Sequence, residues 1–267
     1  MIIHNFSPIF IDLVFFQIRW YSIAYIMGIV LGWWFANRII ENNTIYKRSN
    51  ITTKIFDDLI IYIIIGIIMG GRIGYIVFYN LEYYSENFID SFKLWEGGMS
   101  FHGGLIGVVF GTIIFSKIKK INFFRIADII ACVSPIGIFF GRLANFINGE
   151  LYGKVSSVPW AIIFPKIDNF PRHPSQIYEA ILEGLILLLV VNFFSFKKNM
   201  ILEKGYTSGI FLIFYSIFRL LSEIFREPDN HIGYFFDYYS MGMILSFGTL
   251  ISGLLIILYI KKNEKNN

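Results

Sequence analysis

A cluster of polar side chains among glycines lies at residues 141–153, which read GRLANFINGELYG. Arg142 supplies a guanidinium that can bind phosphate through two parallel hydrogen bonds, and the amides of Asn145 and Asn148 can donate to the remaining oxygens or to hydroxyls. The alternative is structural, with Arg142 anchoring the end of an apolar segment and pairing with Glu150. We favour binding of an anionic headgroup, because an isolated anchoring arginine needs neither the asparagines nor the glycines.

Glycines also flank His102, in the segment 97–104 that reads GGMSFHGG. Its imidazole can act as a general base near neutral pH, or it can be a structural hydrogen-bonding group. A lone histidine is usually structural, so the spacing by itself favours the second role. The other histidines, His4, His173 and His231, lie in loops. No pair of histidines has the spacing of metal ligands, so we predict no metal site.

A third group of polar residues follows helical spacing. Tyr215, Arg219 and Glu223 are each four residues apart and therefore share one face of a helix, and Arg226 follows them. Arg219 is placed to hydrogen-bond Tyr215 and to pair with Glu223. Inside an apolar segment, such a pair indicates either a polar cavity for a ligand or an interhelical lock.

Three further polar residues have simpler explanations. Arg72 lies in the segment GGRIGY, residues 70–75, which is either a site built around a buried cation or a face on which helices pack closely. Ser175 precedes an apolar segment and is a candidate N-cap. The single cysteine, Cys132, has apolar neighbours, so we expect a buried and inert thiol.

The composition indicates which elements must position these residues. Of the 267 residues, 55% are hydrophobic and 16% are charged, whereas a soluble domain carries about 25% charged residues. A spanning helix takes about 20 apolar residues, so the chain can supply about seven. We predict an all-α polytopic membrane protein, a single domain over residues 1–267 with a structured extracytoplasmic loop at about 142–176. The predicted apolar stretches are 22–36, 59–78, 101–115, 126–140, 177–194, 210–225 and 241–260.

The positive charges predict the orientation, because cytoplasmic loops carry an excess of lysine and arginine. They gather after the first, third and fifth stretches and in the tail: Arg38, Lys47, Arg48 and Lys54; Lys117, Lys119, Lys120 and Arg125; Lys197, Lys198 and Lys204; and Lys261, Lys262 and Lys265. We therefore expect the N-terminus outside, without a cleaved leader, and the C-terminus in the cytoplasm. The net charge of +4 belongs to this pattern, so we expect no nucleic-acid binding.

These motifs together resemble those of the bacterial prolipoprotein diacylglyceryl transferases. The segment 141–153 resembles the family signature in full. The other matching segments are RWY at 19–21, SFHGG at 100–104, HPSQIYE at 173–179, REPD at 226–229 and SMG at 240–242. The resemblance therefore extends over nearly the whole chain.

The resemblance implies an enzyme that transfers the diacylglyceryl group of phosphatidylglycerol to the thiol of the lipobox cysteine in a preprolipoprotein and releases glycerol phosphate. It implies a multi-pass protein of the bacterial inner membrane with its active site towards the periplasmic face. The implied partners are phosphatidylglycerol, the signal peptide with its lipobox, and the lipid bilayer, and no cofactor is implied. By position, the catalytic candidates are His102, Arg142, Glu150 and Arg219. The candidates for binding phosphatidylglycerol are Tyr25, Arg142, Asn145, Glu150, Gly153, Tyr215, Arg219 and Glu223.

In this reaction phosphate is the leaving group and the substrate's own cysteine is the nucleophile. We assign Arg142 and Arg219 to the phosphate, because a cation that binds more tightly as negative charge develops lowers the barrier. His102 is either the base for the thiol or, if the arginines lower the thiol pKa enough, a residue that only shapes the site.

Two other functions are compatible with the charged residues. In a transporter or channel for an anionic solute, Arg72, Arg142 and Arg219 would line a path through the membrane. A noncatalytic lipid-binding protein would bind phosphatidylglycerol without releasing glycerol phosphate. The motif residues gather towards one face of the membrane, which favours chemistry at the interface.

Overall fold

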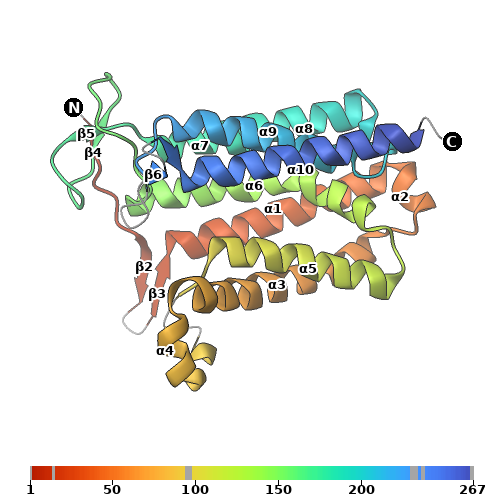
Figure 1. The fold of residues 1–267 in the computed structure, drawn as a ribbon, viewed down its shortest axis with the longest axis horizontal. Coiled ribbons are helices and arrows are strands. Elements are labelled where there is room, and N and C mark those ends of the chain that lie inside the picture. Colours follow the sequence, from red (N-terminus) through yellow and green to blue (C-terminus); the bar gives the residue numbers. More distant parts are fainter. Residues whose placement is uncertain (1, 14–15, 94–97, 229–233, 236–237, 265–267) are drawn as a thin grey trace. The chain divides into compact units, whose positions relative to one another are not determined.

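The computed structural model of the chain describes residues 2–13, 16–93, 98–228, 234–235 and 238–264 (Figure 1). The described chain is mostly helical. Its helices are α1 Trp20–Asn42, α2 Thr44–Arg48, α3 Thr53–Tyr79, α4 Leu81–Glu86, η1 Phe88–Phe92, α5 Phe101–Lys119, α6 Phe123–Asn148, α7 Ser175–Glu179, η3 Ala180–Ile186, α8 Leu187–Asn192, η4 Phe193–Lys197, η5 Met200–Leu202, α9 Tyr206–Glu223 and α10 Met241–Glu264. Its strands are β1 Ile2–Ile3, β2 Ile9–Leu13, β3 Phe16–Arg19, β4 Ile162–Ile163, β5 Pro171–Arg172, β6 Tyr234–Phe235 and β7 Tyr239–Ser240.

Every predicted apolar stretch overlaps a helix or a run of consecutive helical segments. Among the described residues, 5 helices are long and apolar enough to cross a membrane: Trp20–Asn42, Thr53–Phe78, Phe123–Asn148, Ser175–Lys197 and Met241–Asn263. The remaining two stretches lie in α5 and α9, which have 19 and 18 residues. The predicted class, a polytopic helical membrane protein, is confirmed by these helices.

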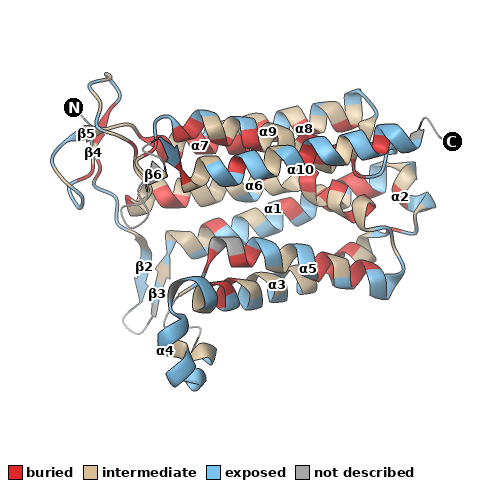
Figure 2. Cartoon of the chain, in the orientation of Figure 1, coloured by how far each residue is buried: buried red, intermediate tan, exposed pale blue. Residues whose placement is uncertain are grey.

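Many apolar side chains of these helices are exposed on the surface of the protein, and an apolar surface of this size is unfavourable in water. On α10, for example, Leu254, Leu255 and Leu258 are 46%, 60% and 62% exposed. Pale blue stretches along α3 and α10 mark such exposed residues (Figure 2). Lipid chains can cover this surface at no cost, so the exposure fits a bilayer.

The connection between α6 and α7 is shorter than predicted. Helix α6 continues through Arg142 and Asn145 to Asn148, so these two side chains are held by a helix and the connection comprises residues 149–174. Part of this connection forms a small sheet with the N-terminal strand, in the order β1-β4-β5. Strand β1 is parallel to β4, and β4 is antiparallel to β5.

The chain folds as two compact units, one formed by Met1–Ala36 with Asp128–Asn267 and the other by Asn37–Ala127. The boundaries fall inside α1 and α6. We call the first the large unit and the second the small unit.

Glycines bring α3 and α5 of the small unit into direct backbone contact (Figure 1). A Cβ atom on Gly107 would lie 1.9 Å from the carbonyl oxygen of Gly66, and one on Gly70 would lie 2.4 Å from that of Gly103. Small residues allow such an approach between helices in lipid. The packing interpretation of the glycine-rich segment around Arg72 is therefore confirmed.

Arg72 itself is buried at the end of this helix pair and is a structural residue. Its guanidinium donates to four backbone carbonyls that follow α4: Asp90 at 2.6 Å, Ser91 at 2.8 Å, Gly98 at 3.2 Å and Lys93 at 3.3 Å. These hydrogen bonds stabilise the buried guanidinium and hold η1 against α3.

In the large unit, α9 and α10 pack side by side (Figure 1). Helix α9 begins after Gly205, which has a φ of 89° and gives no side-chain cap. A carboxylate from α6 replaces it: Asp128 accepts hydrogen bonds from the backbone N–H groups of Gly205 at 2.7 Å and Ser208 at 2.9 Å. A negative charge stabilises the free N–H groups at a helix N-terminus. One turn further along α6, Cys132 is fully buried, as predicted.

Candidate active site

Three arginines and three glutamates meet inside the large unit, and we call them the arginine–glutamate cluster. Its members are Arg142 of α6, Glu179 of α7, Glu183 of η3, Arg219 and Glu223 of α9, and Arg226 just beyond α9. The charges therefore come from α6, from the consecutive segments α7 and η3, and from α9 and the residues that follow it. The cluster includes both arginines that the sequence assigned to phosphate.

Glu179 and Glu183 lie between the two arginines. Arg142 contacts Glu179 at 2.8 Å and Glu183 at 3.0 Å, and Arg219 contacts the same two glutamates at 3.2 Å and 3.5 Å. Arg226 reaches Glu179 at 3.6 Å. The two guanidinium groups are thus directed at the same pair of carboxylates from opposite helices.

The cluster is buried but not closed. The side chains of Glu179 and Glu183 have no exposed surface, whereas that of Arg142 is 15% exposed and that of Arg219 is 10% exposed. Buried charges of this kind are costly unless they are paired, and an intramembrane arginine usually indicates a functional site. The arginines, including Arg226 at 9%, therefore carry most of the accessible surface of the cluster.

The predicted pair between Arg219 and Glu223 is present, with a separation of 2.7 Å. Glu223 also accepts a hydrogen bond from Ser240 at 2.7 Å, so the start of α10 is held to the end of α9. The predicted hydrogen bond from Arg219 to Tyr215 is not found among the described residues, because the Arg219 guanidinium faces glutamates. Tyr215 instead stacks on Phe211, with ring centroids 5.9 Å apart.

Glu150 does not pair with Arg142, so that structural alternative is wrong. Glu150 accepts hydrogen bonds from the hydroxyl of Tyr21 and from the amide of Asn145, the latter at 2.9 Å. The Asn145 amide also donates to the Tyr21 hydroxyl. Asn145 lies three residues after Arg142 and therefore near the same face of α6. A second polar group, Tyr21 with Asn145 and Glu150, thus lies beside the arginine–glutamate cluster.

The segment HPSQIYE positions the backbone around Glu150. The side-chain amide of Gln176 donates to the carbonyl oxygen of Glu150 at 2.7 Å, and the hydroxyl of Ser175 donates to that of Leu151 at 2.9 Å. The prediction that Ser175 caps the helix is wrong, because Pro174 occupies the N-cap position and the serine hydroxyl serves the neighbouring loop.

Gly153 has a packing role in this structure. A Cβ atom there would lie 2.5 Å from the carbonyl oxygen of His173 and 2.7 Å from that of Phe225. Its carbonyl oxygen accepts a hydrogen bond from Arg172 at 3.1 Å, and Arg172 also contacts Asp168 at 2.6 Å. These contacts fix the connection that follows the signature segment.

The Asp168–Arg172 pair predicts a pH-dependent stability of this connection. The hydrogen bonds from Arg172 hold the pKa of Asp168 below its ordinary value. A carboxylate whose pKa is lowered by folding stabilises the fold above its unfolded pKa, and this contribution is lost as the pH falls through the folded pKa. Asp168→Asn is expected to reduce the hydrogen-exchange protection of residues 153–173 at neutral pH, with a difference from wild type that begins to shrink below about pH 4 and disappears once the pH is below the lowered pKa of Asp168.

Asp12→Asn is the matched control, because Asp12 is an exposed carboxylate that accepts a hydrogen bond from Gln17 at 3.2 Å. It should leave protection of residues 153–173 unchanged at every pH. An Asp168→Asn difference that persists unchanged in acid would contradict the assigned cause.

The remaining candidates are placed as follows. Tyr25 is 62% exposed and stacks on Tyr21, with ring centroids 6.0 Å apart. His102 lies in the first turn of α5, and its side chain is outside the part of the chain that the structure describes. Within the described residues, no group of three or more His, Cys, Asp or Glu side chains is arranged to hold a metal ion.

Sequence reasoning did not place Tyr21, Glu179 or Glu183 among the candidate site residues. Glu183 had a usable signal, since it is a carboxylate inside an apolar stretch and lies four residues after Glu179. Tyr21 had a weaker one, because an aromatic residue at the start of a spanning helix is common at the membrane interface.

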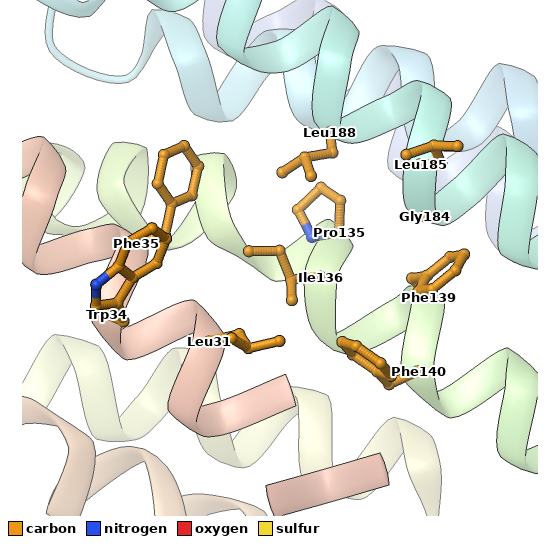
Figure 3. A pocket seen from close by; sticks show the side chains of 10 residues that line it. All are labelled: Leu31, Trp34, Phe35, Pro135, Ile136, Phe139, Phe140, Gly184, Leu185 and Leu188. Atoms are coloured by element: carbon orange, nitrogen blue, oxygen red, sulfur yellow. The ribbon is translucent and has the colours of Figure 1, made fainter. Parts of the chain in front are cut away.

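An apolar pocket of about 360 Å³ is lined in part by residues close in sequence to Arg142 and Glu183. It is lined by Leu31, Trp34, Phe35, Pro135, Ile136, Phe139, Phe140, Gly184, Leu185 and Leu188, from α1, α6, η3 and α8 (Figure 3). Phe139 lies one turn before Arg142, and Gly184 directly follows Glu183. A ligand with a charged headgroup and an apolar chain can therefore find both environments within one helical turn.

Comparison with known proteins finds matches over nearly the whole chain. The family model for prolipoprotein diacylglyceryl transferase matches residues 8–259. Proteins named phosphatidylglycerol-prolipoprotein diacylglyceryl transferase are similar over nearly their whole length. That of Rickettsia bellii (strain OSU 85-389) is 50% identical over 95% of each chain. That of Rickettsia felis (strain ATCC VR-1525 / URRWXCal2) is 49% identical over 95% of this chain and 96% of its own.

A third relative, from Rickettsia typhi (strain ATCC VR-144 / Wilmington), is 48% identical over 96% of this chain and 98% of its own, and it carries the same name. The matched region includes every motif segment that carried the resemblance. The resemblance and the predicted enzyme class, a transferase, are confirmed. This chain therefore belongs to the prolipoprotein diacylglyceryl transferase family.

Proposed function

We propose that this chain transfers the diacylglyceryl group of phosphatidylglycerol to the thiol of the lipobox cysteine of a preprolipoprotein. The thiol loses its proton, and its sulfur attacks the carbon of the diacylglyceryl group that is bonded to the phosphate oxygen. The bond between that carbon and that oxygen breaks. The electron pair of that bond goes to the phosphate oxygen, so glycerol phosphate leaves. The products are a thioether-linked lipoprotein and glycerol phosphate.

The observation that carries this proposal is the convergence of Arg142 and Arg219 on one site from opposite helices. Two guanidinium groups can bind the phosphate from two sides, and their attraction grows as charge develops on the leaving group. The nucleophile comes from the substrate, which agrees with the burial of Cys132.

The second polar group is suited to the glycerol end of the lipid headgroup. Tyr21, Asn145 and Glu150 offer hydroxyl, amide and carboxylate groups that can exchange their mutual hydrogen bonds for the lipid hydroxyls. We also assign lipid binding to Tyr25, Tyr215 and Glu223. Gly153 contributes indirectly, because it lets the surrounding backbone pack closely. We assign one acyl chain of the lipid to the apolar cavity lined by Phe139 and Leu188.

We further propose that the whole chain acts as one transferase in the bacterial inner membrane, with seven spanning helices, the N-terminus in the periplasm and the C-terminus in the cytoplasm. The basic residues between alternate helices support this orientation. The end of α6 and the starts of α1, α7 and α10 share the polar contacts of the site, which supports a site at one membrane face. On this orientation that face is periplasmic.

The test is release of glycerol phosphate by the purified protein from phosphatidylglycerol labelled in its headgroup. The second substrate is a lipobox peptide that carries either cysteine or serine at the modified position. We expect release that requires the cysteine peptide, together with a thioether-linked diacylglyceryl peptide in the mass spectrum. The rate that remains in His102→Gln then distinguishes the two roles of His102. A large loss of rate indicates a general base, and a small loss of rate indicates a residue that only shapes the site.

The result that would overturn the proposal is specific. A folded wild-type protein that binds phosphatidylglycerol but releases no glycerol phosphate with the cysteine peptide would be a lipid-binding protein and not a transferase.

A further inference from the structure

The arginine–glutamate cluster is electrically balanced without any ligand. Its three arginines face three glutamates, and all six side chains are buried or nearly so. A phosphodiester brings one more negative charge. In a buried site that extra charge would be repelled by the carboxylates that the arginines already hold.

We propose that Glu183 is a displaceable counter-ion: its carboxylate holds Arg142 and Arg219 together when no lipid is bound, yields them to the lipid phosphate, and takes up a proton as it does so. This inference rests on the proposed function. It assigns to Glu183 the role of a positioning residue that competes with the substrate for the same two arginines.

The partners of the three glutamates single out Glu183. Glu179 contacts three arginines, Arg142, Arg219 and Arg226, so it stays paired if two of them turn to a ligand. Within the residues that the structure describes, the only cations that the Glu183 carboxylate contacts are Arg142 and Arg219. Its exchange therefore opens one position on each of these two arginines, while Arg142 stays paired with Glu179 and Arg219 with Glu179 and Glu223.

Glu223 is held in a different way. It contacts Arg219 at 2.7 Å and accepts the Ser240 hydroxyl at 2.7 Å. The backbone of Gly242 also packs against it, since a Cβ atom there would lie 2.7 Å from a Glu223 oxygen. Release of Glu223 would detach the start of α10, so this carboxylate is a poor candidate for exchange.

The local backbone confines the movement to the side chain. Glu183 lies in the π-helical segment Ala180–Ile186, and such segments occur frequently at functional sites. The next residue, Gly184, is packed so closely that a Cβ atom would lie 2.6 Å from that of Phe139. The backbone here cannot shift towards α6, so the carboxylate must leave the arginines by rotation of its own side chain.

A proton must accompany this rotation. A buried carboxylate without its arginines is strongly disfavoured, and the charged or titratable groups that face Glu183 are Arg142, Arg219, Glu179 and Tyr215. Once both arginines bind phosphate, the remaining neighbours offer no free positive charge to Glu183. The neutral carboxylic acid is then the stable form.

The experiment is titration calorimetry of the purified full-length protein in detergent with a short-chain phosphatidylglycerol, in the absence of peptide. Titrations are run in two buffers that have different ionisation enthalpies. The difference between the two binding enthalpies gives the number of protons taken up per lipid. We expect wild type to take up one proton per lipid wherever Glu183 is ionised in the free protein and protonated in the lipid complex, so that its Kd rises about tenfold per pH unit over that range. A phosphodiester has no second proton, so the lipid does not contribute.

Glu183→Gln should bind the lipid about tenfold or more tightly than wild type at alkaline pH, because a like charge has been removed from the anion site. It should also take up no proton, so its Kd should not depend on pH. The matched control is Glu223→Gln, which removes the same charge from the same cluster. Uptake of one proton should persist in that variant.

Two results would overturn the inference: wild type that binds the lipid without taking up a proton, or Glu183→Gln that keeps the wild-type proton uptake. The wild-type measurement does not depend on the folding of any variant. Failure of the proposed function has a different signature, since wild type would then release no glycerol phosphate in the peptide assay whatever its proton uptake.

Discussion

Arg142→Ala is expected to lower the rate of glycerol phosphate release by about 10²- to 10³-fold, because it removes one of the two guanidinium groups that stabilise charge on the leaving phosphate. Glu179 and Glu183 would then face only Arg219 and Arg226, so anion binding should weaken as well. The measurement is the steady-state rate with phosphatidylglycerol and the cysteine peptide, with kcat and KM determined separately.

Arg142→Lys is the matched variant, because it keeps the charge and loses the two-pronged hydrogen bonding of a guanidinium. It should fall between wild type and Arg142→Ala in rate. Circular dichroism must show that both variants keep their helices. A folded Arg142→Ala protein with more than about a tenth of the wild-type rate would contradict the role assigned to this residue.

Gly107→Ala is expected to destabilise the small unit more than a methyl group added at any other glycine of α3 or α5. The new Cβ atom would lie 1.9 Å from the carbonyl oxygen of Gly66, so α3 and α5 must separate along their shared face. Overpacking of this kind costs about 1–3 kcal/mol, or more where backbone cannot yield. The measurement is loss of helical circular dichroism on heating the purified protein in detergent.

Gly104→Ala is the control on the same helix. Its new Cβ atom would lie 3.7 Å from the carbonyl oxygen of Ile67, which is an ordinary contact. Alanine also favours the helix over glycine by about 1 kcal/mol, so this variant should be as stable as wild type or slightly more so. Equal destabilisation by the two substitutions would show that α3 and α5 are not in backbone contact.

The sequence predicted the helices and the local pairs well, because both depend on short-range spacing. Apolar stretches located every long helix, and the four-residue spacing of Arg219 and Glu223 predicted their ion pair. The same rule applied to Glu179 and Glu183 would have placed both carboxylates on one face. Nothing in the sequence, however, shows which arginines that face would meet, since Arg142 and Arg219 are 36 or more residues away from Glu183.

Two local explanations that the sequence allows are not found in the structure. The ion pair between Arg142 and Glu150, which was the alternative to headgroup binding, is absent because α6 continues to Asn148 and Glu150 contacts Tyr21 and Asn145. Ser175 has the residue type of an N-cap, but its hydroxyl is used by Leu151, which comes 24 residues earlier. In both cases a tertiary contact outweighed a local preference.

The capping of α9 by Asp128 also has a consequence for the order of events during synthesis. The carboxylate and its partner Gly205 are 77 residues apart in the chain. At about 5–20 residues per second, the ribosome needs about 4–15 s to make the intervening segment. During that interval the bonds to Gly205 and Ser208 cannot exist, and a nascent chain that stops before Gly205 never forms them. Capping of α9 by Asp128 is therefore a late event in biosynthesis, set by the arrival of α9.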